Sequence, residues 1–111
     1  MNVIKPTVGR KVWYRPTKFD SQGPGGMNFS PSQPLDATVL AVWGDSLVNV
    51  LVLDIMGKPF TKTSIKLLQP GEPAPVDGEG NNPGGYVEWM PYQVGQAKAV
   101  ADVGKVGAGP T

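Results

Sequence analysis

The sequence lacks cysteine and histidine altogether. Without them the chain cannot form a Ser-His-Asp or Cys-His nucleophile system, a zinc site of Cys and His ligands, or a disulfide. No apolar run approaches the roughly 18 residues that a membrane-spanning helix requires, and residues 1–6 show no signal-peptide core. We therefore expect a protein that is made in the cytoplasm and does not bind membranes.

Charge is also scarce. Charged residues make up 17% of the chain, against about 25% in ordinary soluble domains, while hydrophobic residues make up 40%. The net charge of +1 is too small to predict strong overall attraction to nucleic acid. A surface this poor in charge indicates that part of it is hidden, and we expect a protein partner or self-association.

Glycine and proline, in contrast, are abundant. They supply 15 and 12 of the 111 residues, about twice their usual share of roughly 12%. A chain of this length forms about one domain, and so many turn-forming residues exclude a helical bundle. We expect a small all-β domain.

Alternating apolar residues predict five or six short strands. They cover residues 10–15, 37–43, 47–53, 59–61, 63–68 and 86–89, with Gly/Pro-rich loops over 16–34 and 69–85. The pattern predicts a single-domain barrel or sandwich over residues 1–92, with an SH3-like barrel favoured and a jelly roll as the alternative. Residues 93–111 are expected to form a flexible or docking C-terminal tail with at most a short helix.

Residues 37–53 are the most informative segment. They contain one charge, Asp45, and form two β-rich runs around a Gly-containing turn, which predicts a hairpin. Both faces of each strand are apolar or nearly so, and we expect both to be covered. The expected core or self-association seam consists of Val39, Val42, Val48, Val50 and Val52. Trp43 stands at the turn, where a large aromatic residue either covers the core or anchors a partner.

A second candidate surface is basic. Lys11, Trp13, Arg15 and Lys18 lie in and just after the first strand. Cations interleaved with an aromatic residue can bind phosphates and stack bases, so these residues are the candidates for an alternative nucleic-acid site. The competing interpretation is that Trp13 or the adjacent Tyr14 is core and the cations are solvated edge residues.

The acidic residues fit turn chemistry better than catalysis. Asp36, Asp45 and Asp54 each stand at a strand end or turn, where aspartate accepts hydrogen bonds from its own backbone. Residues 77–88 superficially resemble a calcium loop, but Asn82 stands where the turn glycine belongs. We expect no catalytic residue, no metal site and no cofactor.

Two segments carry a family resemblance. Residues 6–10 (PTVGR) with Val12 and Tyr14, and residues 86–93 (YVEWMPYQ) with Gly95-Gln96-Ala97, resemble small proteins encoded in tailed bacteriophages and prophages. In size and composition the chain is also similar to phage capsid decoration, or staple, proteins. That resemblance implies a protein that binds the outside of the assembled shell and clamps neighbouring capsid subunits.

We therefore expect a non-enzymatic virion protein on the capsid surface. Its partner would be the major capsid protein, with a dimer or trimer of the chain on the shell. In this hypothesis Trp43 and the two long loops meet the capsid, and deleting residues 95–111 weakens binding without unfolding the barrel. The alternative is a small phage nucleic-acid-binding or regulatory barrel in the host cytoplasm.

Overall fold

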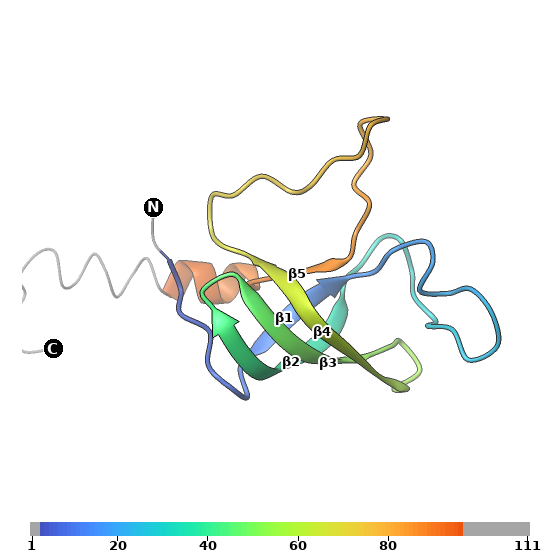
Figure 1. Ribbon diagram of the computed structural model, residues 1–111, viewed down its shortest axis with the longest axis horizontal. Helices are drawn as coiled ribbons and strands as arrows, with labels where there is room; N and C mark the ends of the chain where they lie inside the picture. Colours follow the sequence, from blue (N-terminus) through green and yellow to red (C-terminus); the bar gives the residue numbers. More distant parts are fainter. Residues whose placement is uncertain (1–2, 97–111) are drawn as a thin grey trace, which may run out of the picture.

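A computed structural model of the chain describes residues 3–96 and places five strands in one closed barrel. The strands are β1 (Lys11–Arg15), β2 (Leu35–Gly44), β3 (Leu47–Leu53), β4 (Pro59–Leu68) and β5 (Tyr86–Glu88) (Figure 1). Strands β1 to β4 form an antiparallel meander. Strand β5 then runs parallel to β4 and antiparallel to β1, which closes the barrel.

The predicted all-β barrel is confirmed, and the jelly-roll alternative is wrong. A jelly roll places eight strands in two sheets, whereas this meander closes on itself through β5, an arrangement consistent with the favoured SH3-like barrel. The segments expected as two strands, 59–61 and 63–68, form the single strand β4. A register irregularity opposite Val48–Val50 and a positive φ at Ser64 absorb the break in the pattern.

The segment predicted as a tail begins with ordered structure. Residues 91–96 are helical. The side chain of Gln93 donates a hydrogen bond to the Lys11 carbonyl (2.8 Å), and Val94 packs against the core. The remainder of the predicted tail, residues 97–111, lies outside the described residues.

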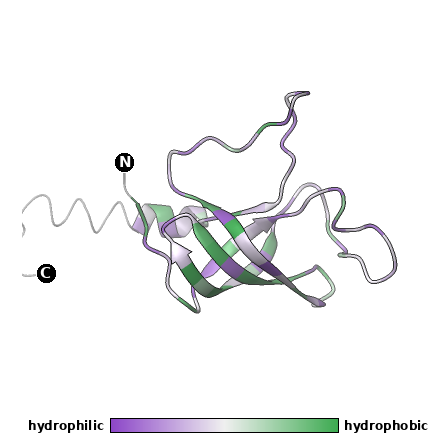
Figure 2. Cartoon of the chain, in the orientation of Figure 1, coloured by the Kyte–Doolittle hydropathy of each residue, from purple (hydrophilic) through white to green (hydrophobic). Residues whose placement is uncertain are grey.

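The core follows the alternation in the sequence. Every second residue of β1 and β3 points inward, and these side chains are almost completely buried. Figure 2 shows the hydrophobic colour concentrated on the strands, while the long loops are pale or hydrophilic. The largest fully buried side chains are Tyr14, Leu67, Val12, Val39, Val48, Val50, Val52 and Val87. Trp89, just after β5, is 4% exposed and belongs to the same core.

The two ends of the barrel carry different segments (Figure 1). The turn between β2 and β3, residues 3–9 and residues 91–96 lie at one end, and the 16–34 loop lies at the other. Gln69 fixes the first end. Its side-chain amide accepts the backbone N–H of Ile4 (2.9 Å) and donates to the carbonyls of Ile4 (3.0 Å) and Asp45 (2.6 Å). No helix within residues 3–96 is long and apolar enough to cross a membrane.

Candidate functional site

The end of the β2–β3 hairpin carries exposed apolar side chains. Leu40, Val42, Trp43 and Leu47 are 44%, 36%, 62% and 42% exposed, and we call them the hairpin surface. The pairing of β2 with β3 is irregular between Val39 and Ala41 and again between Val42 and Gly44. Each irregularity leaves one residue of β2 without an opposite partner, and bulges of this kind turn side chains outward. The bulged residues are Leu40 and Trp43. Leu40 points outward by strand alternation alone, because Leu35, Ala37 and Val39 are buried, so the irregularity is needed only to explain the exposure of Trp43.

The Trp43 ring is held in place although it is exposed. Its indole Nε1 donates a hydrogen bond to Asn49 Oδ1 (2.9 Å), and the same oxygen accepts the Ser64 backbone N–H (2.7 Å). One amide oxygen thus links the side chain of β2 to β3 and β4. A large aromatic side chain that is already ordered loses little conformational entropy on binding, and such residues dominate protein interfaces.

The structure divides the six residues predicted for partner binding. Val39, Val48, Val50 and Val52 have no exposed surface, so the core interpretation holds for them and they cannot touch a partner. This corrects their assignment to a binding surface: they alternate into the barrel, where five closed strands enclose them. Only Trp43 and Val42 are accessible. Nothing among the described residues covers the outer face at the hairpin surface, so its cover by a partner stays a prediction.

Two residues of the hairpin surface, Leu40 and Leu47, were not predicted as partner contacts. Leu47 had a usable signal, because it lies on the strand face opposite the inward valines. Leu40 had the same signal, because it lies on the face of β2 opposite the buried Ala37 and Val39. Lys66, opposite Leu47, forms an ion pair with Glu72 (3.1 Å), whereas Asp45, in the turn between Trp43 and Leu47, forms none within the described residues.

The predicted nucleic-acid residues come together only in part. Lys11, Trp13 and Arg15 alternate onto the outer face of β1, and the Arg15 guanidinium lies 5.7 Å from the centre of the Trp13 ring. Acidic residues of the neighbouring strands pair with both cations. Lys11 contacts Asp36 (3.1 Å), and Arg15 contacts Glu88. The face is therefore close to neutral.

The fourth predicted residue, Lys18, lies beyond the end of β1 in the 16–34 loop, with its amine 5.2 Å from the Phe19 ring. It lines an open cleft of about 690 Å³ between the two long loops, together with Phe29, Tyr86 and the Arg15–Glu88 pair. Tyr86 is buried here on the outside of the barrel, and its hydroxyl accepts a hydrogen bond from Asn82 (2.8 Å).

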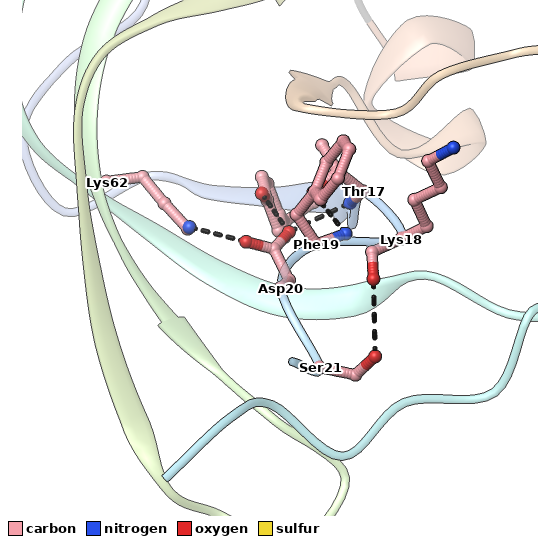
Figure 3. A network of polar contacts seen from close by, with 7 residues as sticks. Thr17, Lys18, Phe19, Asp20, Ser21 and Lys62 are labelled. Carbon is pink, nitrogen blue, oxygen red and sulfur yellow. Dashed lines mark hydrogen bonds and ion pairs between the residues drawn. The ribbon is translucent and has the colours of Figure 1, made fainter. Parts of the chain in front are cut away.

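A polar network attaches the 16–34 loop to the barrel (Figure 3). The Asp20 carboxylate accepts hydrogen bonds from the Tyr14 hydroxyl (2.6 Å), the Thr17 backbone N–H (2.8 Å) and the Lys62 amine (2.6 Å). Burial opposes ionisation of this carboxyl, but the bonds from Lys62 and Tyr14 outweigh it and hold the pKa of Asp20 below its ordinary value. Burial, followed by the hydrogen bond to Asp20, raises the pKa of Tyr14 far above its ordinary value. The pKa shifts of Asp20 and Tyr14 therefore follow from their role in anchoring the 16–34 loop.

Of the three aspartates predicted to serve turns, Asp54 does so, whereas Asp36 lies within β2 and pairs with Lys11. Asp54 accepts backbone N–H groups of Asn28, Met56 and Lys58 (2.9–3.0 Å), and the bond from Asn28 is the largest cause of its lowered pKa. Asp77 accepts the backbone N–H groups of residues 79 and 81, and its pKa is likewise lowered. Within residues 3–96 no three acidic side chains are grouped so that they could hold a metal ion.

No protein-family model, no curated protein and no solved structure matches this chain. Its function is therefore inferred from its own residues, and the hairpin surface is the strongest candidate site because it is apolar, exposed and held in a fixed geometry.

Proposed function

We propose that the protein is a non-enzymatic virion protein of a tailed phage that decorates the capsid, binding the outer shell and clamping neighbouring capsid subunits. The observation that carries the proposal is the hairpin surface: an ordered, exposed Trp43 among exposed aliphatic side chains, on a barrel whose own core is complete. The resemblance of residues 6–10 and 86–93 to small phage proteins supplies the phage context.

The energetics of such a contact are favourable. Burying one large apolar side chain contributes about 1.5–3 kcal/mol, so four of them supply several kcal/mol before the cost of association. With few charges near the contact, little desolvation of charge opposes this gain. Trp43 is the expected dominant contact, since tryptophan is enriched among residues whose loss weakens an interface most.

The arrangement of the two barrel ends supports a clamp. We expected Trp43 and both long loops to meet the capsid, and the hairpin end and the 16–34 loop lie at opposite ends of the barrel (Figure 1). Two separated contacts on a rigid body can engage two neighbouring subunits at once, and the second contact then forms at high effective concentration. In this proposal the hairpin surface binds one capsid subunit and the 16–34 loop binds the next.

Particle composition tests the role directly. DNA-filled particles of the phage carrying this gene should contain the protein at a level close to that of the major capsid protein, measured by quantitative mass spectrometry. Its absence from purified particles would reject the decoration role.

Binding of purified protein to undecorated particles tests the site. Trp43→Ser and Leu47→Ser should each weaken binding at least tenfold, because each removes an apolar contact of about 1.5–3 kcal/mol. Val76→Ser is the matched control, because Val76 is 68% exposed in the 69–85 loop, which belongs to neither proposed contact. Equal capsid binding by all three variants would show that the contact lies elsewhere on the molecule. Size-exclusion chromatography of the same variants reports whether this surface instead forms the predicted dimer or trimer.

The alternative, nucleic-acid binding through Lys11, Trp13, Arg15 and Lys18, has less support because acidic side chains pair with two of its cations. The dependence of binding affinity on salt concentration distinguishes nucleic-acid binding from adhesion to a capsid. Phosphate contacts lose affinity steeply as ionic strength rises, whereas apolar adhesion to a capsid changes little. Oligonucleotide binding that falls with salt and is lost in Lys18→Glu would favour the alternative.

A further inference from the structure

A second cleft, distinct from the hairpin surface, lies between residues 3–11 and residues 90–96. It has a volume of about 700 Å³. Its lining combines three cations, Lys5, Arg10 and Lys11, with the apolar side chains of Val3, Ile4 and Met90 and the ring of Tyr92. We call it the basic cleft. Neither the proposed capsid contact nor the alternative nucleic-acid site on β1 accounts for it.

The charge in the basic cleft is unbalanced. Within residues 3–96, no Asp or Glu lines it. Lys11 is engaged with Asp36 on the outer face of the sheet, but among the described residues neither Lys5 nor Arg10 forms an ion pair with a carboxylate. The Arg10 guanidinium lies 5.6 Å from the centre of the buried Trp89 ring. Stacking of this kind leaves the N–H donors of arginine able to bind a carboxylate.

Both walls of the cleft are fixed to the barrel. On one side, Gln69 bonds both backbone groups of Ile4, whose side chain is 7% exposed. On the other side, the Gln93 amide accepts the Met90 backbone N–H (2.9 Å) and donates to the Lys11 carbonyl (2.8 Å). The cleft therefore exists before a ligand arrives, which lowers the entropic cost of binding. Val3 and Tyr92, 50% and 71% exposed, stand at its rim.

We propose that the basic cleft binds an acidic peptide segment of a partner protein, with one or two Asp or Glu carboxylates on Lys5 and Arg10 and an adjacent apolar side chain against Val3 and Met90. Charge complementarity selects the acidic residues, and the apolar lining selects the apolar one. A single nucleic-acid strand fits less well, because such sites present successive aromatic rings for stacking, and Tyr92 is the only ring that the described residues contribute to this lining. The proposal does not depend on the capsid contact, which uses other residues.

Selection from a random peptide library tests the chemistry without assuming a sequence. The immobilised full-length chain should enrich peptides in which Asp or Glu adjoins Leu, Ile, Val or Phe. Lys5→Glu/Arg10→Glu should lose this enrichment by at least tenfold. Lys18→Glu/Lys58→Glu is the matched control, with the same change in charge outside the basic cleft, and should keep it. Enrichment without acidic residues, or enrichment retained in the cleft variant, would overturn the proposal.

Backbone amide NMR locates the contact. Adding the best-enriched peptide to the labelled full-length chain should shift the amide resonances of Lys5, Arg10 and Gln93, whereas shifts confined to the hairpin surface would reject the cleft. In parallel, a single-stranded oligonucleotide is added as competitor. If it displaces the peptide from these residues at lower concentration than unlabelled peptide does, the ligand is nucleic acid and the proposal is wrong. An unchanged spectrum in the cleft variant without peptide establishes that the fold survives.

Discussion

Asp20 illustrates what one acidic side chain does for a long loop. Its carboxylate is 8% exposed and holds the 16–34 loop to Tyr14 of β1 and Lys62 of β4. A loop of this length with so many Gly and Pro residues has a large conformational entropy, and three charge-assisted hydrogen bonds oppose it. Nothing in the local sequence around Asp20 indicates that Lys62, 42 residues away, is its partner.

Replacing this carboxylate should have a measurable cost. We predict that Asp20→Asn lowers the free energy of unfolding by about 1–3 kcal/mol at pH 7, the usual range for hydrogen bonds to a charged group. Because the pKa is lowered in the folded state, this contribution is present above the ordinary value of 3.8 and is lost as the pH falls through the folded pKa.

Urea unfolding of the wild type and Asp20→Asn between pH 7 and pH 2 checks both parts, since the difference between them should shrink below about pH 4. Asp36→Asn serves as the control, because the Lys11–Asp36 pair is half exposed and should contribute less than about 1 kcal/mol. A difference that is constant with pH would mean that the charge of Asp20 contributes nothing.

At the scale of the strands, Ser64 shows how β4 crosses its irregularity. It is the one described non-glycine residue with a positive φ, 49°. The left-handed region costs an ordinary residue about 1–2 kcal/mol. The bond from its backbone N–H to Asn49 holds it there, and the same Asn49 orders Trp43. The backbone strain at Ser64 is thus coupled, through Asn49, to the position of Trp43 in the hairpin surface.

The positive φ at position 64 reverses the usual preference of a strand for β-branched residues over glycine. We predict that Ser64→Val lowers the free energy of unfolding by about 1–2 kcal/mol although valine favours strands, while Ser64→Gly is neutral or stabilising. Thermal unfolding of both variants measures which of them is the more stable. Thr63→Val, one residue earlier in β4, should not be destabilising, and a destabilisation equal to that of Ser64→Val would exclude backbone strain as the cause.

The two long loops meet at Gly84. Its φ is +72°, and a β-carbon there would lie 2.1 Å from the carbonyl oxygen of Pro16. The next residue, Gly85, donates its backbone N–H to the Arg15 carbonyl (2.6 Å). The close approach of the 69–85 loop to the end of β1 therefore requires the absence of a side chain.

We predict that Gly84→Ala lowers the free energy of unfolding by about 1–3 kcal/mol more than Gly80→Ala does, because it adds a steric clash to the strain that the two share. Gly80 is the matched control, with a φ of +82° and open space around its β-position. Chemical denaturation measures the difference. Equal effects would show that the loops separate at little cost.

At the scale of the whole molecule, the structure moves the boundary of the domain. The sequence pattern ended it at residue 92, but Gln93 and Val94 contact the barrel. We predict that deleting residues 97–111 changes the free energy of unfolding by less than about 0.5 kcal/mol, whereas deleting 91–111 lowers it by about 1–3 kcal/mol through the lost hydrogen bonds and packing.

The shorter deletion also tests the docking role of the tail. If residues 97–111 bind a neighbouring subunit, their removal weakens capsid binding while urea unfolding stays unchanged. Unchanged capsid binding would exclude the tail from the mechanism, and a large loss of stability would show that the barrel extends beyond residue 96.

The local sequence determined the strands and the inward side chains of this protein, because strand alternation is a property of consecutive residues. It thereby put Val48, Val50 and Val52 on one strand face and singled out Trp43. Only the tertiary structure decided what depends on distant residues. Closure of the barrel buried four of the five valines, and an irregularity in the pairing with β3 left Trp43 exposed. Pairing between strands neutralised Lys11 and Arg15, and the packing of residues 3–9 against 91–96 built the basic cleft. These outcomes depend on the register between strands and on contacts between segments far apart in the sequence, which no short window of residues encodes.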